Sequence, residues 1–360
     1  MIAFLNLVPG PDAADVRDAI DRVVTRGWFV LGPELDTFEK EFATAVAAPY
    51  AVGVGTGTDA LALALRAAGI GRGDEVITPP LSAAYSALAI MMSGARPLFA
   101  DIDGDRLTLD PRAVEAAITP KTRALMPVHL YGQPADMPAL TAIADRHGLA
   151  IIEDCCQAHL ATCGGRPVGS FGVASAYSFY PTKNLGALGD GGAITTPSAD
   201  MAARLRRLRN GGQIDRYHHR EFGVNSRLDE MQAAILRGRL TWLPQWTAQR
   251  RELAADYRRR LQGAPIVVPA EHDAGHVYHL FPILSERRDA LQAHLKSRGV
   301  ETLIHYPVPI PRQPALASER PAPCPVADRV CARVLSLPLH PGMSAHDVAE
   351  VASAVHDYRG

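Results

Sequence analysis

The chain has 360 residues, more than one small hydrophobic core can organise, so its length predicts a large domain with a smaller one. Apolar residues make up 47% and charged residues 21% of the chain, which excludes a disordered or fibrous protein. Lysine and arginine (37) nearly cancel aspartate and glutamate (38), so the overall charge favours neither nucleic acid nor an acidic membrane as a partner.

The start of the chain and the cysteines predict its compartment. No basic residue precedes the apolar start, and Asp12 and Asp15 follow soon after, which is unlike a secretory signal. No apolar run approaches the length that spans a membrane. The five cysteines form an odd set without a paired framework, so we expect reduced thiols, a cytoplasmic protein and no bound metal ion.

Regular apolar patterns predict the first two thirds of the chain. Two helices are expected first, with apolar faces formed by Val16, Ile20 and Val23, then by Leu35, Phe38 and Phe42. The expected strands are residues 50–54, 75–78, 97–101, 124–129, 149–153, 174–179 and 192–195. Helices between them include residues 58–68, 83–92, 137–147 and 199–209. This alternation predicts an α/β fold with a mostly parallel seven-stranded sheet, whose ligands lie beyond the carboxyl ends of its strands.

The rest of the chain has a different pattern. A long helix from residue 227 to about residue 260 is followed by a strand (278–284), a helix (287–298), a strand (301–305) and two closing helices. These elements predict a small α+β domain, and we expect the large domain at 1–240 and the small one at 241–360. The proline-rich segment 307–325 is too long for a simple connector, which makes it a candidate wall of a site.

The strongest chemical signal is Lys183, which follows an expected strand and precedes four glycines within nine residues. Glycines let the backbone approach a flat ligand closely. A lysine that is partly removed from water there has a lowered pKa, and its neutral amine can form a Schiff base. A surface lysine in a flexible turn is the alternative interpretation.

Asp154 changes the balance between these interpretations, because it ends the apolar strand 149–153 at the ligand edge of the sheet. Pyridoxal phosphate (PLP) needs an anion at its ring nitrogen, since the protonated ring withdraws electrons from the reacting carbon. An aspartate at such a turn is often only a helix cap. Asp154 and Lys183 on neighbouring expected strands together favour PLP.

A glycine-rich turn at residues 53–60 leads from a strand into a helix. Free backbone N–H groups and the helix dipole suit a phosphate there. The stretch also fits a loose dinucleotide-binding pattern, but the following strand ends in Thr78 and two prolines rather than in an acidic residue. An NAD-linked oxidoreductase is therefore disfavoured, and it would leave Lys183 without a role.

Several motifs occur in one order along nearly the whole chain: Phe4-Leu-Asn-Leu, Trp28-Phe-Val-Leu-Gly-Pro-Glu-Leu-Asp-Thr-Phe-Glu, Gly57-Thr-Asp-Ala-Leu, Glu153-Asp-Cys-Cys-Gln-Ala-His, the Lys183 loop, Gly223-Val-Asn-Ser-Arg-Leu-Asp-Glu, His305-Tyr-Pro and Leu337-Pro-Leu-His-Pro. With them the chain resembles the nucleotide-sugar aminotransferases of the DegT/StrS type. The resemblance implies a PLP-dependent transferase of fold type I that works as a homodimer with shared active sites.

The same resemblance implies roles for individual residues. Lys183 would form the Schiff base with PLP and move protons, Asp154 would face the ring nitrogen, and Gln157 would lie near the phenolic oxygen of the ring. The phosphate would be held by Gly57, Thr58, Ser178 and, from a second subunit, Asn225. The chain departs from the family at Ala83, where an aromatic residue usually covers the ring and Tyr85 is a candidate substitute, and at Leu160, which is usually glycine.

The segment Thr302-Leu-Ile-His-Tyr-Pro is similar to the branch that aminates C3 of 3-keto-6-deoxyhexoses on a dTDP carrier, with L-glutamate or L-glutamine as donor. A 4-keto sugar and an amino-cyclitol remain alternative substrates. Candidate substrate contacts are His159, Tyr217, His218, His305 and Tyr306, although a structural His-Tyr pair and a polar loop are the alternatives.

Two further functions use the same fold. In a dehydrating branch of the family a histidine replaces the Schiff-base lysine, so Lys183 argues against that branch. A non-catalytic ligand sensor would not need the complete set of site residues, which this chain retains: Lys183, Asp154, Gln157, Ser178 and Asn225.

Overall fold

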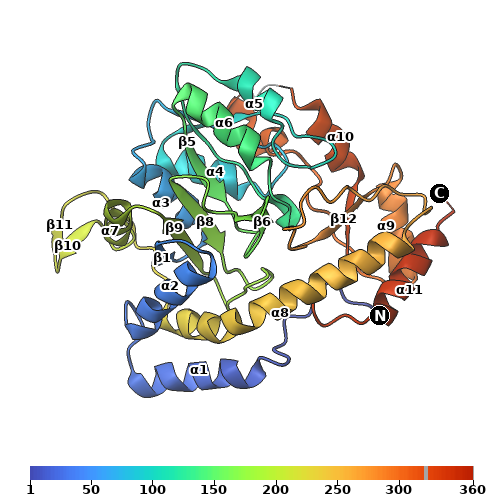
Figure 1. Ribbon diagram of the computed structural model, residues 1–360, viewed down its shortest axis with the longest axis horizontal. Coiled ribbons are helices and arrows are strands. Elements are labelled where there is room, and N and C mark those ends of the chain that lie inside the picture. The colour runs from blue at the N-terminus through green and yellow to red at the C-terminus, as the bar shows by residue number, and fades with distance from the viewer. Residues whose placement is uncertain (320–322, 360) are drawn as a thin grey trace.

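Figure 1 shows the protein as a computed structural model that describes residues 1–319 and 323–359. Its centre is a seven-stranded sheet with the order β1-β9-β8-β5-β4-β2-β3. β9 runs antiparallel to β1 and β8, and the other neighbours pair parallel. The α/β class and the seven expected strands are confirmed: β1 Tyr50–Val54, β2 Glu75–Thr78, β3 Arg96–Phe99, β4 Thr122–Leu125, β5 Ala150–Asp154, β8 Ala174–Ser178 and β9 Gly192–Thr196.

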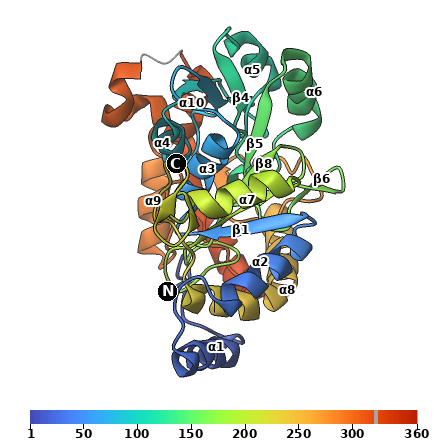
Figure 2. The same ribbon diagram turned by 90° about the vertical axis from the view of Figure 1, so that its left-hand side faces the viewer.

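Helices cover both faces of this sheet (Figures 1 and 2), as the run of apolar residues in each strand predicts. Successive strand residues point to opposite faces. Ile151 accordingly packs in the core formed with α2, α6 and α8, whereas its neighbour Ile152 packs in the core formed with α3, α4 and α7. The covering helices are α2 Pro33–Ala45, α3 Gly57–Ala67, α4 Tyr85–Ser93, α5 Pro111–Ala117, α6 Met137–His147, α7 Ala199–Leu208 and α8 Glu230–Arg260.

The long helix α8 connects the two halves of the molecule (Figure 1). Its first part packs against α1, Ala13–Arg26, and contributes Leu236 and Leu243 to the core beneath the sheet. Its last part contributes Leu253 and Tyr257 to a separate C-terminal core. The helix continues through Pro244. The boundary expected near residue 240 falls inside this helix and stays a prediction.

The C-terminal part pairs β12, Phe281–Leu284, with β13, Val334–Leu337, and packs α9, Arg288–Ser297, and α11, Ala345–His356, against them. The strand expected at residues 301–305 is wrong, because this segment forms only an isolated bridge between Leu303 and Ser336. Prolines at 307, 309 and 311 lack the N–H groups that would continue a ladder.

The remaining short elements lie outside the main sheet. The expected proline-rich segment 307–325 contains the 3₁₀ turns η2 Ile310–Arg312 and η3 Pro314–Glu319, and it leads into α10 Pro325–Arg333, while residues 320–322 lie outside the described part. Small ribbons are formed by β6 Thr162–Cys163 with β7 Arg166–Pro167, and by β10 Gln213–Asp215 with β11 His218–His219. Among the described helices, none combines the length and the apolar character needed to cross a membrane.

The first residue of α8 also holds the start of α2. The buried carboxylate of Glu230 accepts the backbone N–H groups of Gly32, Glu34 and Leu35, each at 2.9 Å. The first N–H groups of a helix have no partner within the helix, and the helix dipole favours an anion at that position. A residue almost two hundred positions away therefore caps α2.

We predict that Glu230→Ala lowers the free energy of unfolding by about 3 kcal/mol, because three buried N–H groups lose a charged acceptor. Urea denaturation followed by circular dichroism measures this change. Glu252→Ala removes an exposed carboxylate from the same helix and serves as the control. Equal stability of the two variants would contradict the capping role of Glu230.

Candidate functional site

The site is built around Asp154, the last residue of β5, whose side chain is only 5% exposed. Ser86, on α4, donates its hydroxyl to Oδ2 of Asp154 at 2.8 Å, and the backbone N–H of Cys156 donates to Oδ1 at 3.1 Å. Each carboxylate oxygen keeps room for a further donor. The carboxylate is thus fixed at the ligand end of the sheet, where the sequence predicted it.

Lys183 lies in the loop between β8 and β9 and is partly buried. Its backbone N–H donates to Tyr180 O at 2.8 Å. Burial lowers the pKa of Lys183 below its usual 10.5, while the neighbouring Cys156 thiol and Asp154 carboxylate act in the opposite direction. An amine that loses its proton more easily is a better nucleophile and proton carrier.

The glycine-rich turn forms a close cradle at the N-terminus of α3. Thr56 caps this helix by accepting the N–H of Asp59, and no hydrogen bond is formed by the N–H groups of Gly57 and Thr58 with the described residues. A Cβ on Gly57 would lie 2.7 Å from that of Ser178, so only glycine allows this approach. Two free N–H groups beside a serine hydroxyl suit a phosphate.

Gln157 is held between two tyrosines. Its Oε1 accepts the backbone N–H of Tyr131 at 2.8 Å, and its Nε2 donates to the hydroxyl of Tyr306 at 3.1 Å. Burial raises the pKa of Tyr306 to about 12. Burial, assisted by the positive charge of Lys183, lowers the pKa of His305 to about 4. The structure therefore brings His305 and Tyr306 from the C-terminal part to the expected cofactor residues.

His159, another candidate substrate contact, is fully buried. Its ring packs against Tyr177 and Phe179, with centroid separations of 5.7 and 5.8 Å. Burial and then the charge of Lys183 lower the pKa of His159 to about 3. The ring is part of the hydrophobic support beneath the site, and a contact with substrate stays a prediction.

The two departures from the family pattern have different surroundings. Tyr85 begins α4 next to Ser86, which contacts Asp154, and it is 62% exposed, while Ala83 lies in the turn before it. A role for Tyr85 against the cofactor ring stays a prediction. Leu160 has a φ of 63°, the left-handed conformation that glycine adopts at no steric cost, which explains the preference for glycine there.

Three other candidates lie outside the cavity at Lys183 within one chain. Tyr217 and His218 belong to the β10–β11 hairpin, which projects from the body of the molecule (Figure 1). Tyr217 is 75% exposed, and Asn225 is exposed where it bridges to Asn210. None of the three lines the cavity at Lys183.

A cavity of about 380 Å³ opens beside Lys183, a size suited to a small-molecule ligand. Residues 5–12 form one side, and Trp242, Trp246 and Arg250 of α8 contribute to its wall. The two tryptophan rings stack with centroids 6.4 Å apart. The sequence motifs did not single out these three residues, although their spacing of four positions along the expected helix could have indicated one common face.

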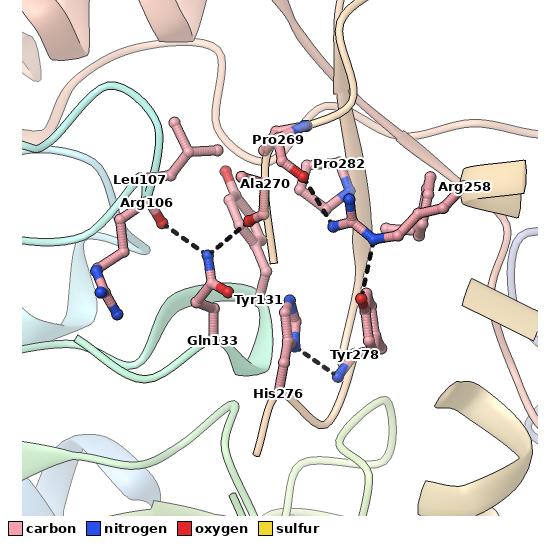
Figure 3. A pocket seen from close by; sticks show the side chains of 11 residues that line it. Arg106, Leu107, Tyr131, Gln133, Arg258, Pro269, Ala270, His276, Tyr278 and Pro282 are labelled. Atoms are coloured by element: carbon pink, nitrogen blue, oxygen red, sulfur yellow. Dashed lines mark hydrogen bonds between the residues drawn. The ribbon is translucent and has the colours of Figure 1, made fainter. Parts of the chain in front are cut away.

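A smaller cavity lies where the large part of the protein meets the C-terminal part (Figure 3). Gln133 Nε2 donates to Ala270 O at 3.2 Å there, and Arg258 donates to the hydroxyl of Tyr278 at 3.0 Å and to Pro269 O at 2.8 Å. Its volume of about 10 Å³ holds no more than a single water molecule. This cavity is part of the junction and not a substrate site.

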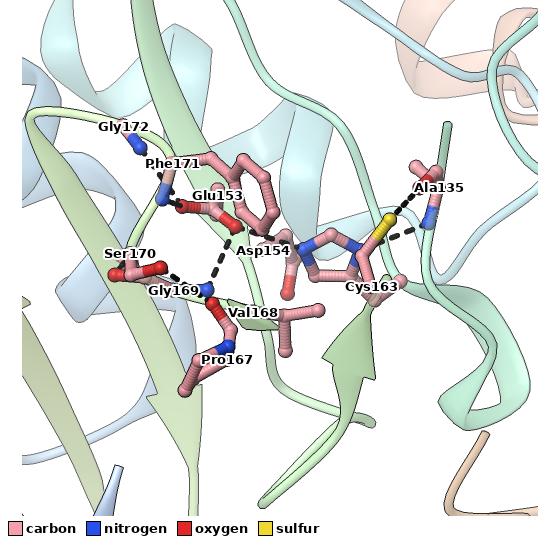
Figure 4. Close-up of polar contacts among 12 residues, drawn as sticks. Ala135, Glu153, Asp154, Cys163, Pro167, Val168, Gly169, Ser170, Phe171 and Gly172 are labelled. Atoms are coloured by element: carbon pink, nitrogen blue, oxygen red, sulfur yellow. Dashed lines mark hydrogen bonds and ion pairs between the residues drawn. The ribbon is translucent and has the colours of Figure 1, made fainter. Parts of the chain in front are cut away.

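His129, Glu153 and Cys155 form a buried cluster next to Asp154; Figure 4 shows the surroundings of Glu153. Nδ1 of His129 accepts the N–H of Ala135 at 3.1 Å, so its Nε2–H donates to Glu153 at 3.2 Å. Burial raises the pKa of the Cys155 thiol well above its usual value. The cluster lacks a free imidazole lone pair and a thiolate, and its hydrogen bonds identify it as structural support.

The sequence of residues 12–356 matches the DegT/DnrJ/EryC1/StrS aminotransferase family. A dTDP-3-amino-3,4,6-trideoxy-alpha-D-glucose transaminase of Streptomyces venezuelae is 50% identical, covering 99% of this chain and 96% of that protein. The Erythromycin biosynthesis sensory transduction protein EryC1 of Saccharopolyspora erythraea is 49% identical, covering 92% of each chain. The crystal structure of S. venezuelae DesV in complex with a ketimine intermediate is 49% identical with a TM-score of 0.96, covering 99% of this chain and 98% of that chain.

We predict that Ser86→Ala lowers kcat about tenfold, because Asp154 loses a buried donor that fixes its carboxylate. The absorption spectrum of the bound cofactor, titrated with pH, should shift in the variant as well. Ser93→Ala is the control: it removes a hydroxyl from the same helix that donates to Ile90 O at 2.7 Å and accepts the N–H of Ala95 at 3.3 Å, without a bond to Asp154. An unchanged spectrum in both variants would contradict the positioning role.

We also predict that the free energy of unfolding falls as the pH drops from about 6.5 to about 4. In this window the unfolded chain binds protons at His159 and His305, whereas the folded pKa values of about 3 and about 4 keep these rings neutral. Urea denaturation at several pH values measures the slope. His159→Gln should reduce this slope by up to about 1.4 kcal/mol per pH unit. His346→Gln, at an exposed site, should leave the slope unchanged.

Proposed function

The chain belongs to the DegT/DnrJ/EryC1/StrS aminotransferase family of PLP-dependent enzymes, and from this premise we propose that it aminates C3 of a dTDP-linked 3-keto-6-deoxyhexose. The 50% identity to a dTDP-3-amino-sugar transaminase over nearly the full chain supports this substrate class. The observation that carries the proposal is Lys183, whose buried amine has a lowered pKa and lies close enough to the buried carboxylate of Asp154 to feel its charge.

The residues at this site fit PLP. When bound, PLP supplies an electron-withdrawing ring that stabilises negative charge on the reacting carbon. In the proposed arrangement, Lys183 holds the cofactor covalently and Asp154 faces its ring nitrogen, while Gln157 lies near its phenolic oxygen. The phosphate is assigned to the free N–H groups of Gly57 and Thr58 and to the Ser178 hydroxyl, as their close approach supports.

Lys183 has a second proposed role as the group that moves protons at the reacting carbon. When the cofactor is bound, its ring would hold the reacting carbon, and the Lys183 amine would hold or move a proton there; burial lowers the pKa of this amine and so favours its neutral form. The donor, L-glutamate or L-glutamine, gives up its amino group first, and the keto sugar receives that group afterwards. Parallel lines in double-reciprocal plots would support this order, and intersecting lines would contradict it.

We further propose that two copies of the chain share their active sites. Large apolar side chains are exposed on the single chain at Trp28, Phe29, Tyr180, Leu188 and Phe222. Such exposure indicates a contact with another protein surface. A two-fold arrangement would bring Asn225 and the β10–β11 hairpin, with Tyr217 and His218, to the cavity of the partner, because a symmetric dimer exchanges identical surfaces.

A sensor is the second candidate function, because a relative with 49% identity has the name of a sensory transduction protein. The two functions differ in what Lys183 must do. A sensor requires only ligand binding, whereas a transaminase requires the amine to be displaced by an amino donor and to return.

The decisive measurement is the visible absorption spectrum of PLP-loaded protein before and after addition of L-glutamate. We predict a band of lysine-bound cofactor that glutamate converts to the amino form, because Lys183 is displaced. Lys183→Ala should lack the band, whereas Lys121→Ala, which removes an exposed lysine, should retain it. A wild-type band that neither glutamate nor glutamine changes would favour the sensor.

The shared site predicts complementation between two inactive variants. Lys183→Ala and Asn225→Ala, produced together, should recover about a quarter of wild-type activity, since half of the randomly formed dimers contain one complete site of two. The separately purified variants serve as controls and should each stay below this value. Recovery that does not exceed the sum of the two controls would refute a site that uses Asn225 of the partner.

A further inference from the structure

Arg250 is a buried cation in the wall of the Lys183 cavity. It lies on α8, is 5% exposed, and uses Nη1 to donate to three backbone carbonyls, those of Tyr278 and His279 at 3.3 Å and of Leu339 at 2.8 Å. These bonds fix the direction of the guanidinium. They leave its positive charge without a negative partner.

The remaining nitrogens of Arg250 are unused. Nε is buried without a hydrogen-bond partner, and Nη2 forms no hydrogen bond with the described residues. Burial alone lowers the pKa of Arg250 to about 10, with no carboxylate opposing the effect. The group therefore stays charged at neutral pH. A buried charge without a counter-charge is costly, and an anionic ligand would remove this cost.

Arg239, another arginine of the same cavity wall, provides the contrast. Its Nε donates to Oδ2 of Asp12 at 2.8 Å and its Nη1 to Gly186 O at 2.7 Å. The protein thus neutralises Arg239 internally, whereas within the described residues Arg250 has no ion pair. The difference indicates that the counter-charge of Arg250 comes from a bound molecule.

Arg250 also lies within electrostatic reach of the reacting amine. Burial holds the pKa of His279 well below its usual range, and the charges of Lys183 and Arg250 both add to this effect. His279 also hydrogen-bonds through Nδ1 with Oδ1 of Asn184, the residue after Lys183, at 3.1 Å. An anion bound by Arg250 would therefore lie in the same cavity as the reactive amine of Lys183.

We propose that Arg250 binds an anionic oxygen group of a substrate in this cavity, either the carboxylate of the amino donor or the diphosphate of the nucleotide sugar. The proposal rests on the proposed function, which supplies both kinds of anion. Guanidinium groups bind carboxylate and phosphate oxygens through charged N–H donors, and Nη2 is the nitrogen of Arg250 that is neither buried nor hydrogen-bonded among the described residues. Arg250 would thus determine which substrates are bound.

The test is calorimetric titration of PLP-loaded protein with two probes, glutarate for the carboxylate and dTDP for the diphosphate. Arg250→Gln should lower the affinity for one of the two probes about 10- to 100-fold, the range expected for a lost charged hydrogen bond. Weaker glutarate binding identifies the donor carboxylate, and weaker dTDP binding identifies the diphosphate. Neither titration requires turnover.

Tyr257→Phe is the matched control, because Tyr257 also lies on α8 and donates to a backbone carbonyl beside Leu339, that of Pro338 at 3.0 Å. It should leave both affinities within about threefold of wild type. If Arg250→Gln does not fold, Arg250→Lys replaces it, since lysine keeps the charge but not the guanidinium N–H donors. Arg250→Lys should lower the affinity for one probe several-fold.

The proposal is overturned if the Arg250 variant binds both probes as wild type does, if wild type binds neither probe, or if the control weakens binding equally. The visible band of lysine-bound cofactor is recorded on the same samples. If Arg250→Gln binds both probes as wild type does and the band is present, only the anion site is refuted. A wild type without the band refutes the proposed function itself.

Discussion

The geometry of the site depends on two adjacent carboxylates at the end of β5, those of Glu153 and Asp154. Their side chains point to opposite sides of the strand. Glu153 accepts the backbone N–H groups of Gly169 and Phe171 at 2.7 Å and of Gly172 at 2.9 Å, and it receives the ring proton of His129 (Figure 4). Asp154 faces the ligand side. A firmly bonded Glu153 fixes the strand end, and this fixes the direction in which Asp154 presents its charge.

The charges around the cavity follow from burial. Among the described residues, Lys183, Arg239 and Arg250 are the lysine and arginine side chains of its wall, and each has a different electrostatic environment. Arg239 is paired with Asp12, Lys183 is made less basic by burial, and Arg250 is held only by neutral carbonyls. A polypeptide that transfers an amine between anionic substrates needs both a neutral amine and a fixed positive charge in one cavity. Burial lowers the pKa of the Lys183 amine, and the Arg250 guanidinium, without an ion pair among the described residues, supplies the positive charge.

The two parts of the chain depend on each other through α8 and through the hydrogen bond between Gln157 and Tyr306. The helix contributes to the core beneath the sheet and to the C-terminal core, and its first residue caps α2. Tyr306 reaches from the C-terminal part to a residue assigned to the cofactor. This bond links the C-terminal part directly to the loop that follows β5.

The sequence by itself determined the seven strands, the α/β class and the positions of Asp154 and Lys183 at strand ends, because local apolar patterns and glycine placement carry that information. It misplaced a strand at 301–305, since this segment pairs with β13 only at Leu303 while the N–H of Glu301 donates to Ile2 O, and such pairing depends on distant segments. Only the tertiary structure brought Ser86 to Asp154 across 68 positions and left Arg250 without an ion pair in the part of the chain that the structure describes. Such contacts arise from the packing of distant segments, and neither spacing nor composition encodes them.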